Sequence, residues 1–250
     1  MKFLKKNRTK SWIIKLFKLT DQSSAEKFEM ESNILLCIER IEQITELNAK
    51  TFDINYQSIY KTKSGLKKAL KSNKELVYCY VDFDSEKTET YFSISNQMLN
   101  LNDKPENSTI DFHLQISTKH CDENWILEFN QHLINKFDFD YGYTTQLDSD
   151  YDSLTERKIS KGLFSSSARI LAKDHIWTSN KIDILNGTIK NLYPINYINE
   201  SHLTNSEQKK IISEFGTLSK VNNRIYKWNL ADLEIEKLKK TKRAELNLIE

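Results

Sequence analysis

The stretch TIDFHLQI, residues 109–116, alternates apolar and polar residues along its whole length. Successive side chains of a strand point to opposite faces, so the four apolar residues predict one buried face. The polar residues Asp111, His113 and Gln115 would then lie on a solvent-exposed face. A sheet with one solvent-exposed face is typical of antiparallel pairing. This stretch therefore predicts an antiparallel sheet.

The segments around this strand extend the same pattern. Residues 76–81 (LVYCYV) and 88–94 (TETYFSI) predict two earlier strands, and residues 141–146 predict a later one. Residues 123–136 carry an apolar stripe at helical spacing, with Asp122 as the expected N-cap.

Helical spacing also occurs nearer both ends of the chain. Residues 24–48 and 64–73 predict two helices before the strands, the first capped by Ser23 or Ser24. Residues 205–215 predict a helix that stops at Gly216, followed by a hairpin around Asn222-Asn223. A last helix is expected over residues 230–244, with Leu230, Leu233 and Leu238 facing inward. The fold class is therefore α+β: an antiparallel sheet with helices packed mainly on one face.

The 250 residues are expected to form an arm and one domain. Residues 1–20 hold seven Lys or Arg and no acid, which predicts a basic N-terminal arm that is frayed or helical. Residues 21–250 would form a single α+β domain, and the polar stretch at 150–165 is compatible with a division into two subdomains.

The composition favours a cytoplasmic protein. No stretch approaches 18 apolar residues, so no transmembrane segment is expected. The basic start has no uninterrupted apolar region and no small-residue cleavage site, unlike a signal peptide. Cys37, Cys79 and Cys121 provide neither a disulfide framework nor zinc-ligand spacing.

Known catalytic and metal-binding patterns do not occur. Asp148-x-Asp150-x-Asp152 begins like a calcium loop, but the glycine and glutamate that the loop needs are replaced by Ser153 and Ile159. The net charge of +2 makes nucleic acid an unlikely partner. We therefore expect no catalytic residue, cofactor, metal or small-molecule substrate, and no enzyme activity.

One acidic segment suits a protein interface. Residues 137–156 carry six acids and no base, interleaved with tyrosines. Tyrosine supplies contact area and carboxylates accelerate association with a basic partner. The predicted partner-binding residues are Tyr141, Tyr143, Asp148, Asp150, Tyr151 and Asp152. The alternative is that the tyrosines pack on the sheet edge and the acids only keep a loop soluble.

Two stretches resemble a known family. These are FDFDYG at 137–142 and ILNGTIKNLYPINYINESHL at 184–203. They are similar to bacterial immunity proteins of polymorphic-toxin and type VI secretion systems, in which an aspartate–aromatic–glycine segment precedes a G-x-I/L-R-x-x-Y-P-x-N-F-L-x-x-x-H-L stretch. The matching residues here are Gly187, Tyr193, Pro194, Asn196, His202 and Leu203.

The match is not complete. Lys190 stands where arginine is common, and Tyr197-Ile198 where Phe-Leu is common. The resemblance implies a cytoplasmic inhibitor that binds and neutralises a cognate toxin protein, and it identifies no catalytic residue. Within the second stretch, Leu192, Tyr193, Ile195 and Ile198 are expected in the core.

Two alternatives remain open. One is a metal-dependent enzyme acting on nucleic acid, with Asp138, Asp140 and His113 at its centre. The other is a scaffold that associates with nucleic acid or membrane through the basic arm.

Overall fold

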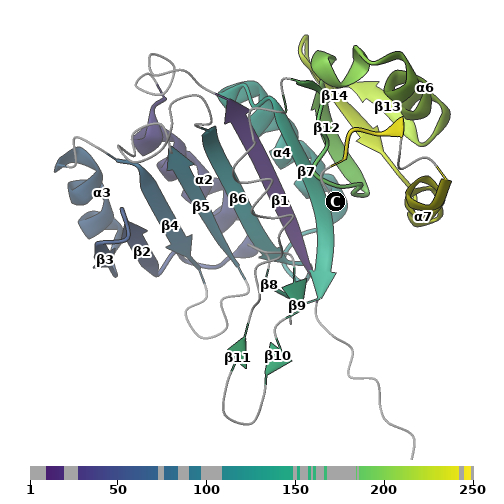
Figure 1. The fold of residues 1–250 in the computed structure, drawn as a ribbon. Coiled ribbons are helices and arrows are strands. Elements are labelled where there is room, and N and C mark those ends of the chain that lie inside the picture. Colours follow the sequence, from purple (N-terminus) through teal and green to yellow (C-terminus); the bar gives the residue numbers. More distant parts are fainter. Residues whose placement is uncertain are drawn as a thin grey trace, which may run out of the picture.

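The computed structural model describes residues 10–19, 28–72, 76–83, 90–96, 109–148, 151–152, 157–158, 160–161, 166–167, 184, 186–241 and 245–248. Within these residues, ten strands form one sheet in the order β13-β14-β12-β7-β1-β6-β5-β4-β2-β3 (Figure 1). Every neighbouring pair of strands is antiparallel. The predicted α+β class with an antiparallel sheet is confirmed.

The strands of this sheet come from both halves of the chain. They are β1 (Lys10–Leu19), β2 (Thr51–Ile54), β3 (Ser58–Tyr60), β4 (Tyr78–Asp82), β5 (Tyr91–Asn96), β6 (Thr109–Ser117), β7 (Tyr141–Asp148), β12 (Ile195–Asn199), β13 (Thr217–Lys220) and β14 (Ile225–Asn229). Two short pairs lie apart from it: β8 (Tyr151–Asp152) with β9 (Arg157–Lys158), and β10 (Ser160–Lys161) with β11 (Ser166–Ser167).

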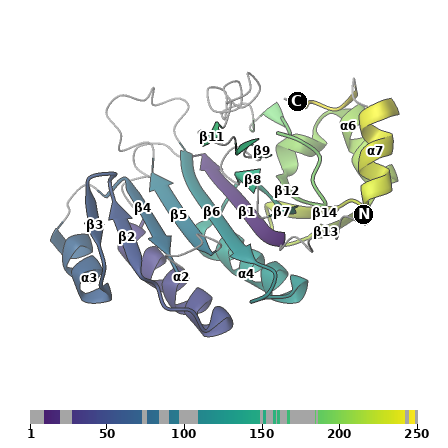
Figure 2. The same cartoon turned by 90° about the horizontal axis from the view of Figure 1, so that it is seen from below.

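Helices cover the two faces of the sheet at different places. The helices are α2 (Met30–Thr45), α3 (Lys63–Ser72), α4 (Glu123–Phe137), the 3-10 helix η4 (Glu200–Leu203), α6 (Ser206–Glu214) and α7 (Asp232–Thr241). Figure 2 shows α2, α3 and α4 on one face of the sheet. It shows α6 and α7 beside β12, β13 and β14, at the end of the sheet away from α3. None of the helices in the described ranges is long and apolar enough to cross a membrane.

Two hydrophobic cores follow from this arrangement. The first lies between α2, α4 and the sheet, and it takes the four apolar residues of β6 as the alternation predicted. The second lies on the opposite face. It contains Phe17 of β1 and Tyr141 and Tyr143 of β7, together with apolar residues of α6 and α7. The second stretch of the family resemblance contributes Leu192, Tyr193 and Ile198 to this second core and Ile195 to the first.

The predicted helices keep their places, and their boundaries differ from the predicted ones by one to several residues. Asp122 caps α4 by accepting a hydrogen bond from the Trp125 amide, 2.9 Å away. Gly216 ends the α6 segment at a φ of 72° and leads into the predicted hairpin. The expectation that Leu233 faces inward is wrong, because its side chain is 80% exposed on α7. The proposed caps Ser23 and Ser24 lie outside the described residues.

The prediction of a frayed or helical basic arm is wrong for residues 10–19. They form β1, which pairs with β6 on one side and β7 on the other and so lies inside the sheet. Both of its faces are buried: Trp12, Ile14 and Leu16 enter the first core, and Phe17 enters the second. Residues 1–9 lie outside the described part of the chain.

The prediction that the polar face of β6 is exposed to solvent is also wrong for the central residues of the strand. His113 and Gln115 are buried, and the ring of His113 meets that of Tyr91 edge-on with centroids 5.4 Å apart. The division near residues 150–165 stays a prediction, since most of that stretch lies outside the described residues.

Candidate protein-binding surface

A group of tyrosines lies on the face of β2, β3 and β4 that is opposite α2. Strand pairing aligns Ile59 with Asp53, and Asp53 with Tyr80. Their neighbours Phe52 and Val81 point the other way into the first core. Tyr78 lies two residues from Tyr80 on β4, and therefore on the same face. We call Asp53, Tyr56, Ile59, Tyr78 and Tyr80 the tyrosine face.

Tyr56 is held at the tip of the β2–β3 hairpin in a backbone conformation that bulky residues seldom adopt. Asn55 and Tyr56 have φ angles of 55° and 57°. A non-glycine residue in this region costs on the order of 1 kcal/mol or more, and such residues gather at functional sites. Tyr56 as a whole residue nevertheless remains 72% exposed.

Hydrogen bonds from the neighbouring strand hold this turn. The side-chain oxygen of Asn55 accepts from the amides of Val77 and Tyr78, at 3.0 and 3.1 Å. The ring of Tyr56 stacks on that of Tyr78, with centroids 3.8 Å apart and planes 12° apart. The turn is therefore built to hold one tyrosine ring outward over another.

The hydroxyl groups of this surface stay neutral. Burial raises the pKa of Tyr56, and the carboxylates of Asp53 and Asp111 raise it further. Burial likewise raises the pKa of Tyr78 and Tyr80 well above the usual range. Neutral tyrosines beside a carboxylate provide donors, acceptors and flat apolar area, and Ile59 adds a side chain that is 67% exposed.

The sequence contained a signal for part of this surface. In the strand LVYCYV, Tyr78 and Tyr80 alternate with Cys79 and Val81, so a buried Cys79 places both tyrosines on the opposite face. The hairpin that presents Tyr56 has strands of only four and three residues, too short for a periodic pattern.

The prediction that Tyr141 and Tyr143 contact a partner is wrong. Their exposed fractions are 1% and 0%, since both side chains lie in the second core. The backbone amide of Lys190 donates to the Tyr141 hydroxyl at 3.0 Å, and its ammonium group donates to the Tyr143 hydroxyl at 2.9 Å. These tyrosines join β7 to the segment before β12.

The remaining residues of the acidic segment are only partly placed. Asp148 is half-buried at the end of β7, opposite Lys10. Tyr151 and Asp152 form β8, in register with Lys158 and Arg157 of β9. Asp150 lies outside the described residues. The role of these four residues in partner binding stays a prediction.

The structure does not assemble the centre proposed for a metal-dependent enzyme. Arg224 forms ion pairs with both Asp138 and Asp140, the second at 2.5 Å. The Leu19 amide donates to the other carboxylate oxygen of Asp140 at 2.9 Å. His113 lies on β6, with β1 between it and β7. The two aspartates therefore hold the β13–β14 hairpin against the centre of the sheet.

In the stretch that carries the family resemblance, the matching residues form buried packing contacts and hydrogen bonds within the protein. Gly187 has a φ of 78°, and a Cβ added there would lie 2.6 Å from the carbonyl oxygen of Ser201. Asn196 binds the backbone of Tyr193 in both directions, at 3.2 and 2.6 Å. His202 is buried with its ring stacked on Tyr141 at 5.5 Å. Burial lowers its pKa to about 4.

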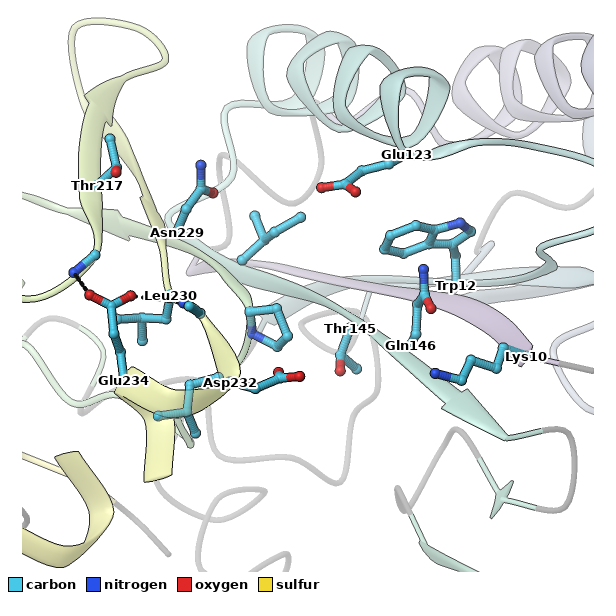
Figure 3. A pocket seen from close by; sticks show the side chains of 15 residues that line it. Lys10, Trp12, Glu123, Thr145, Gln146, Thr217, Asn229, Leu230, Asp232 and Glu234 are labelled. Atoms are coloured by element: carbon cyan, nitrogen blue, oxygen red, sulfur yellow. Dashed lines mark hydrogen bonds between the residues drawn. The ribbon is translucent and has the colours of Figure 1, made fainter. Parts of the chain in front are cut away.

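A pocket of about 740 Å³ opens on another part of the molecule, between β7 and the start of α7 (Figure 3). Its lining includes Lys10, Thr145 and Gln146 on one side and Asn229 and Asp232 on the other. We call this pocket the slot.

Comparison with known proteins gives a likeness of fold. No protein-family model and no curated protein sequence matches the chain. Among solved structures, the Pseudomonas aeruginosa T6SS protein PA0821 is similar, with a TM-score of 0.57 and 8% sequence identity. The alignment covers 88% of this chain but only 65% of that one. At this identity the similarity concerns the fold alone.

Proposed function

We propose that this chain is a cytoplasmic immunity protein that binds and neutralises a cognate bacterial toxin by protein–protein contact. Its action is binding, with no catalytic step. The tyrosine face is the contact surface in this proposal. The observation that carries it is Tyr56, which is 72% exposed and is held outward in a strained turn with its ring stacked on Tyr78.

The sequence resemblance supports a toxin as the partner, and the likeness of fold supports an association with type VI secretion. The sequence resembles immunity proteins through the stretch that contains Tyr193, Pro194 and His202. The fold is similar to that of a T6SS protein. An aromatic surface with a few polar groups is typical of the centre of protein interfaces, where tyrosine is enriched.

The first experiment is co-purification from the native host at low salt, followed by identification of any stoichiometric protein partner. The affinity of that partner is then measured for Tyr56→Ala and for a matched control, Leu233→Ala. Leu233 is another exposed large side chain, on α7. If Tyr56 is an anchor of the interface, its loss weakens binding about thirtyfold or more, mainly through faster dissociation.

The control variant should bind within about twofold of the original protein, since scattered exposed side chains contribute little. Unchanged affinity in Tyr56→Ala would exclude the tyrosine face. Metal-dependent hydrolysis of nucleic acid by the purified chain would instead favour the enzyme.

A further inference from the structure

Asp53 lies in the middle of the tyrosine face. Ile59 of β3 stands directly opposite it on one side, and Tyr80 of β4 on the other. Side chains directly opposite each other in antiparallel strands have Cβ atoms about 4.5–5.5 Å apart. Tyr78 is the diagonal neighbour of Asp53 on β4. The ring of Tyr56 stacks on that of Tyr78, so one carboxylate lies among aromatic rings and an aliphatic side chain.

The carboxylate of Asp53 has no counterion in the described part of the chain. No cation there forms an ion pair with it, and no donor there reaches either of its oxygens. Of the two oxygens only Oδ1 is enclosed, and the residue as a whole is half-buried, so Oδ2 is reached from the solvent. A carboxylate that is partly withdrawn from water gains free energy when a cation donates hydrogen bonds to it.

The negative charge of Asp53 also acts on the stacked rings. Burial raises the pKa of Tyr56, and the carboxylate of Asp53 raises it further. The same carboxylate contributes to the raised pKa of Tyr78, after burial and the neighbouring Tyr56. The face of an aromatic ring attracts a cation that lies within about 6 Å of its centroid. The carboxylate and the rings therefore favour the same kind of ligand, a cation with a flat or apolar surface.

We propose that the tyrosine face is an arginine-binding site, which takes a guanidinium group presented by a partner protein. The guanidinium pairs with Oδ2 of Asp53 and lies against the ring of Tyr56, and its methylene groups pack on Ile59. Arginine fits better than lysine because its planar group both donates to a carboxylate and stacks on an aromatic ring. The inference rests on the proposed function, and it names the chemistry that the toxin presents to the tyrosine face.

The carboxylate disfavours other ligands of an aromatic surface. Nucleic-acid bases stack on exposed aromatic rings, but the phosphates that accompany them carry the same sign of charge as Asp53. An anionic membrane surface meets the same repulsion. The site is separate from the slot, which lies across the sheet between β7 and α7. A protein that presents arginine fits both the charge and the rings.

The first test does not require the toxin. Acetyl-arginine amide is titrated into the isotope-labelled full chain and followed by NMR. We expect saturable shifts of the amides of Asp53, Tyr56 and Ile59, with half-saturation at about 10–100 mM, the range of a single weak contact. The methylene protons of the probe should show nuclear Overhauser effects to the ring of Tyr56. Acetyl-citrulline amide, which has the same shape without the charge, and acetyl-lysine amide should each bind about fivefold more weakly or less.

A matched pair of variants tests the charge of Asp53. Asp53→Asn keeps the size of the side chain and should weaken binding of the arginine probe about fivefold. Asp122→Asn removes the same charge from the N-cap of α4, on the other face of the sheet, and should leave binding unchanged. Asparagine also serves as an N-cap, so the control variant keeps its helix. A well-dispersed spectrum confirms that both variants fold.

The second test uses the co-purified partner. Asp53→Asn should weaken the affinity of the complex about tenfold, as expected for a charge-assisted hydrogen bond. Among arginine-to-glutamine variants of the partner, one should show a similar loss. Combined with Asp53→Asn, that variant should lose less than the product of the two effects, because both changes remove the same contact.

Several results would overturn the inference. They are shifts confined to other surfaces, the absence of saturable shifts with the arginine probe, and equal binding of the citrulline probe. Equal binding of the lysine probe would overturn the choice of arginine. If Tyr56→Ala weakens binding of the partner and Asp53→Asn does not, the inference is wrong and the proposed function stands. If the arginine probe binds at Asp53 but no protein partner is found, the arginine site stands and the proposed function fails.

Discussion

The rings of Tyr143 and Tyr193 lie almost parallel, with centroids 3.8 Å apart and planes 4° apart. Tyr143 belongs to β7, and Tyr193 stands immediately before Pro194 and β12. Proline restricts the residue before it to extended geometry, which fixes the direction of Tyr193. The stack therefore fastens the C-terminal strands to the rest of the sheet.

Loss of this stack should destabilise the whole domain. Tyr143→Ala removes a fully buried ring, and we expect a loss of about 3–5 kcal/mol of unfolding free energy. Tyr143→Phe keeps the stack and loses only the hydroxyl that accepts from Lys190, at a cost of about 1 kcal/mol. Urea unfolding of both variants measures the difference. Equal losses would mean that the hydroxyl, not the ring, holds the segment.

Stability should fall in mild acid because of His202. Burial lowers the pKa of His202 from 6.5 to about 4 in the folded protein. Below pH 6.5 the unfolded chain binds a proton that the folded protein does not, so this contribution is full above pH 6.5 and is lost as the pH falls towards 4. Between pH 7.5 and 5 the loss should be about 2 kcal/mol.

A matched pair of variants tests this assignment. His202→Gln should be less stable at pH 7.5 but should lose much of the dependence on pH. His132→Gln, on the half-buried side of α4, should keep most of it. An unchanged slope in His202→Gln would show that other groups cause the acid sensitivity.

Removal of Arg224 should leave the buried carboxylate of Asp140 without its ion-pair partner on the β13–β14 hairpin. Burial raises the pKa of Asp140, and Arg224 opposes that rise. Because the guanidinium is half-exposed, we expect Arg224→Gln to cost about 2 kcal/mol at pH 7, less than a fully buried pair. The penalty should shrink as acid protonates Asp140. Asp138→Asn, at an exposed position, should cost less than about 1 kcal/mol, and the same denaturation experiment compares the two.

The aspartates and Tyr151 of the acidic segment predict different kinetics with a protein partner. Replacing Asp148, Asp150 and Asp152 with asparagine should slow association and reduce its dependence on salt, because steering acts at long range. Tyr151→Ala should instead speed dissociation if Tyr151 is a buried anchor, with a loss above about 2 kcal/mol. Rates measured at low and high salt decide this. Unchanged rates in both variants would leave the acids as a solvated loop.

Local patterns predicted the elements that local interactions determine. Asp122 caps α4 as the sequence predicted, and the β13–β14 turn lies at the asparagine pair that predicted it. The apolar side of β6 followed from its alternation. These features depend on residues within a few positions of one another.

The errors concern contacts between distant segments. Lys15 and Lys18 interrupt the apolar run of β1, which therefore resembled a basic arm, whereas the sheet buries it between β6 and β7. Tyr141 and Tyr143 belong to a segment rich in acids and were expected at the surface, but the segment around Lys190 covers them. Only the three-dimensional structure shows which residues, distant in the sequence, cover a given strand.

The position of β1 has a consequence for biosynthesis. Leu19 pairs with Thr109, and Phe17 with Tyr141, so the first strand leaves the ribosome long before either neighbour exists. At about 5–20 residues per second, it waits for several seconds as an unpaired apolar segment. Lys10, Lys15 and Lys18 place charge within that segment, as gatekeeper residues do in strands prone to aggregation. The same lysines that make this strand resemble a basic arm in the sequence would thus reduce aggregation of the nascent chain until β6 and β7 pair with β1.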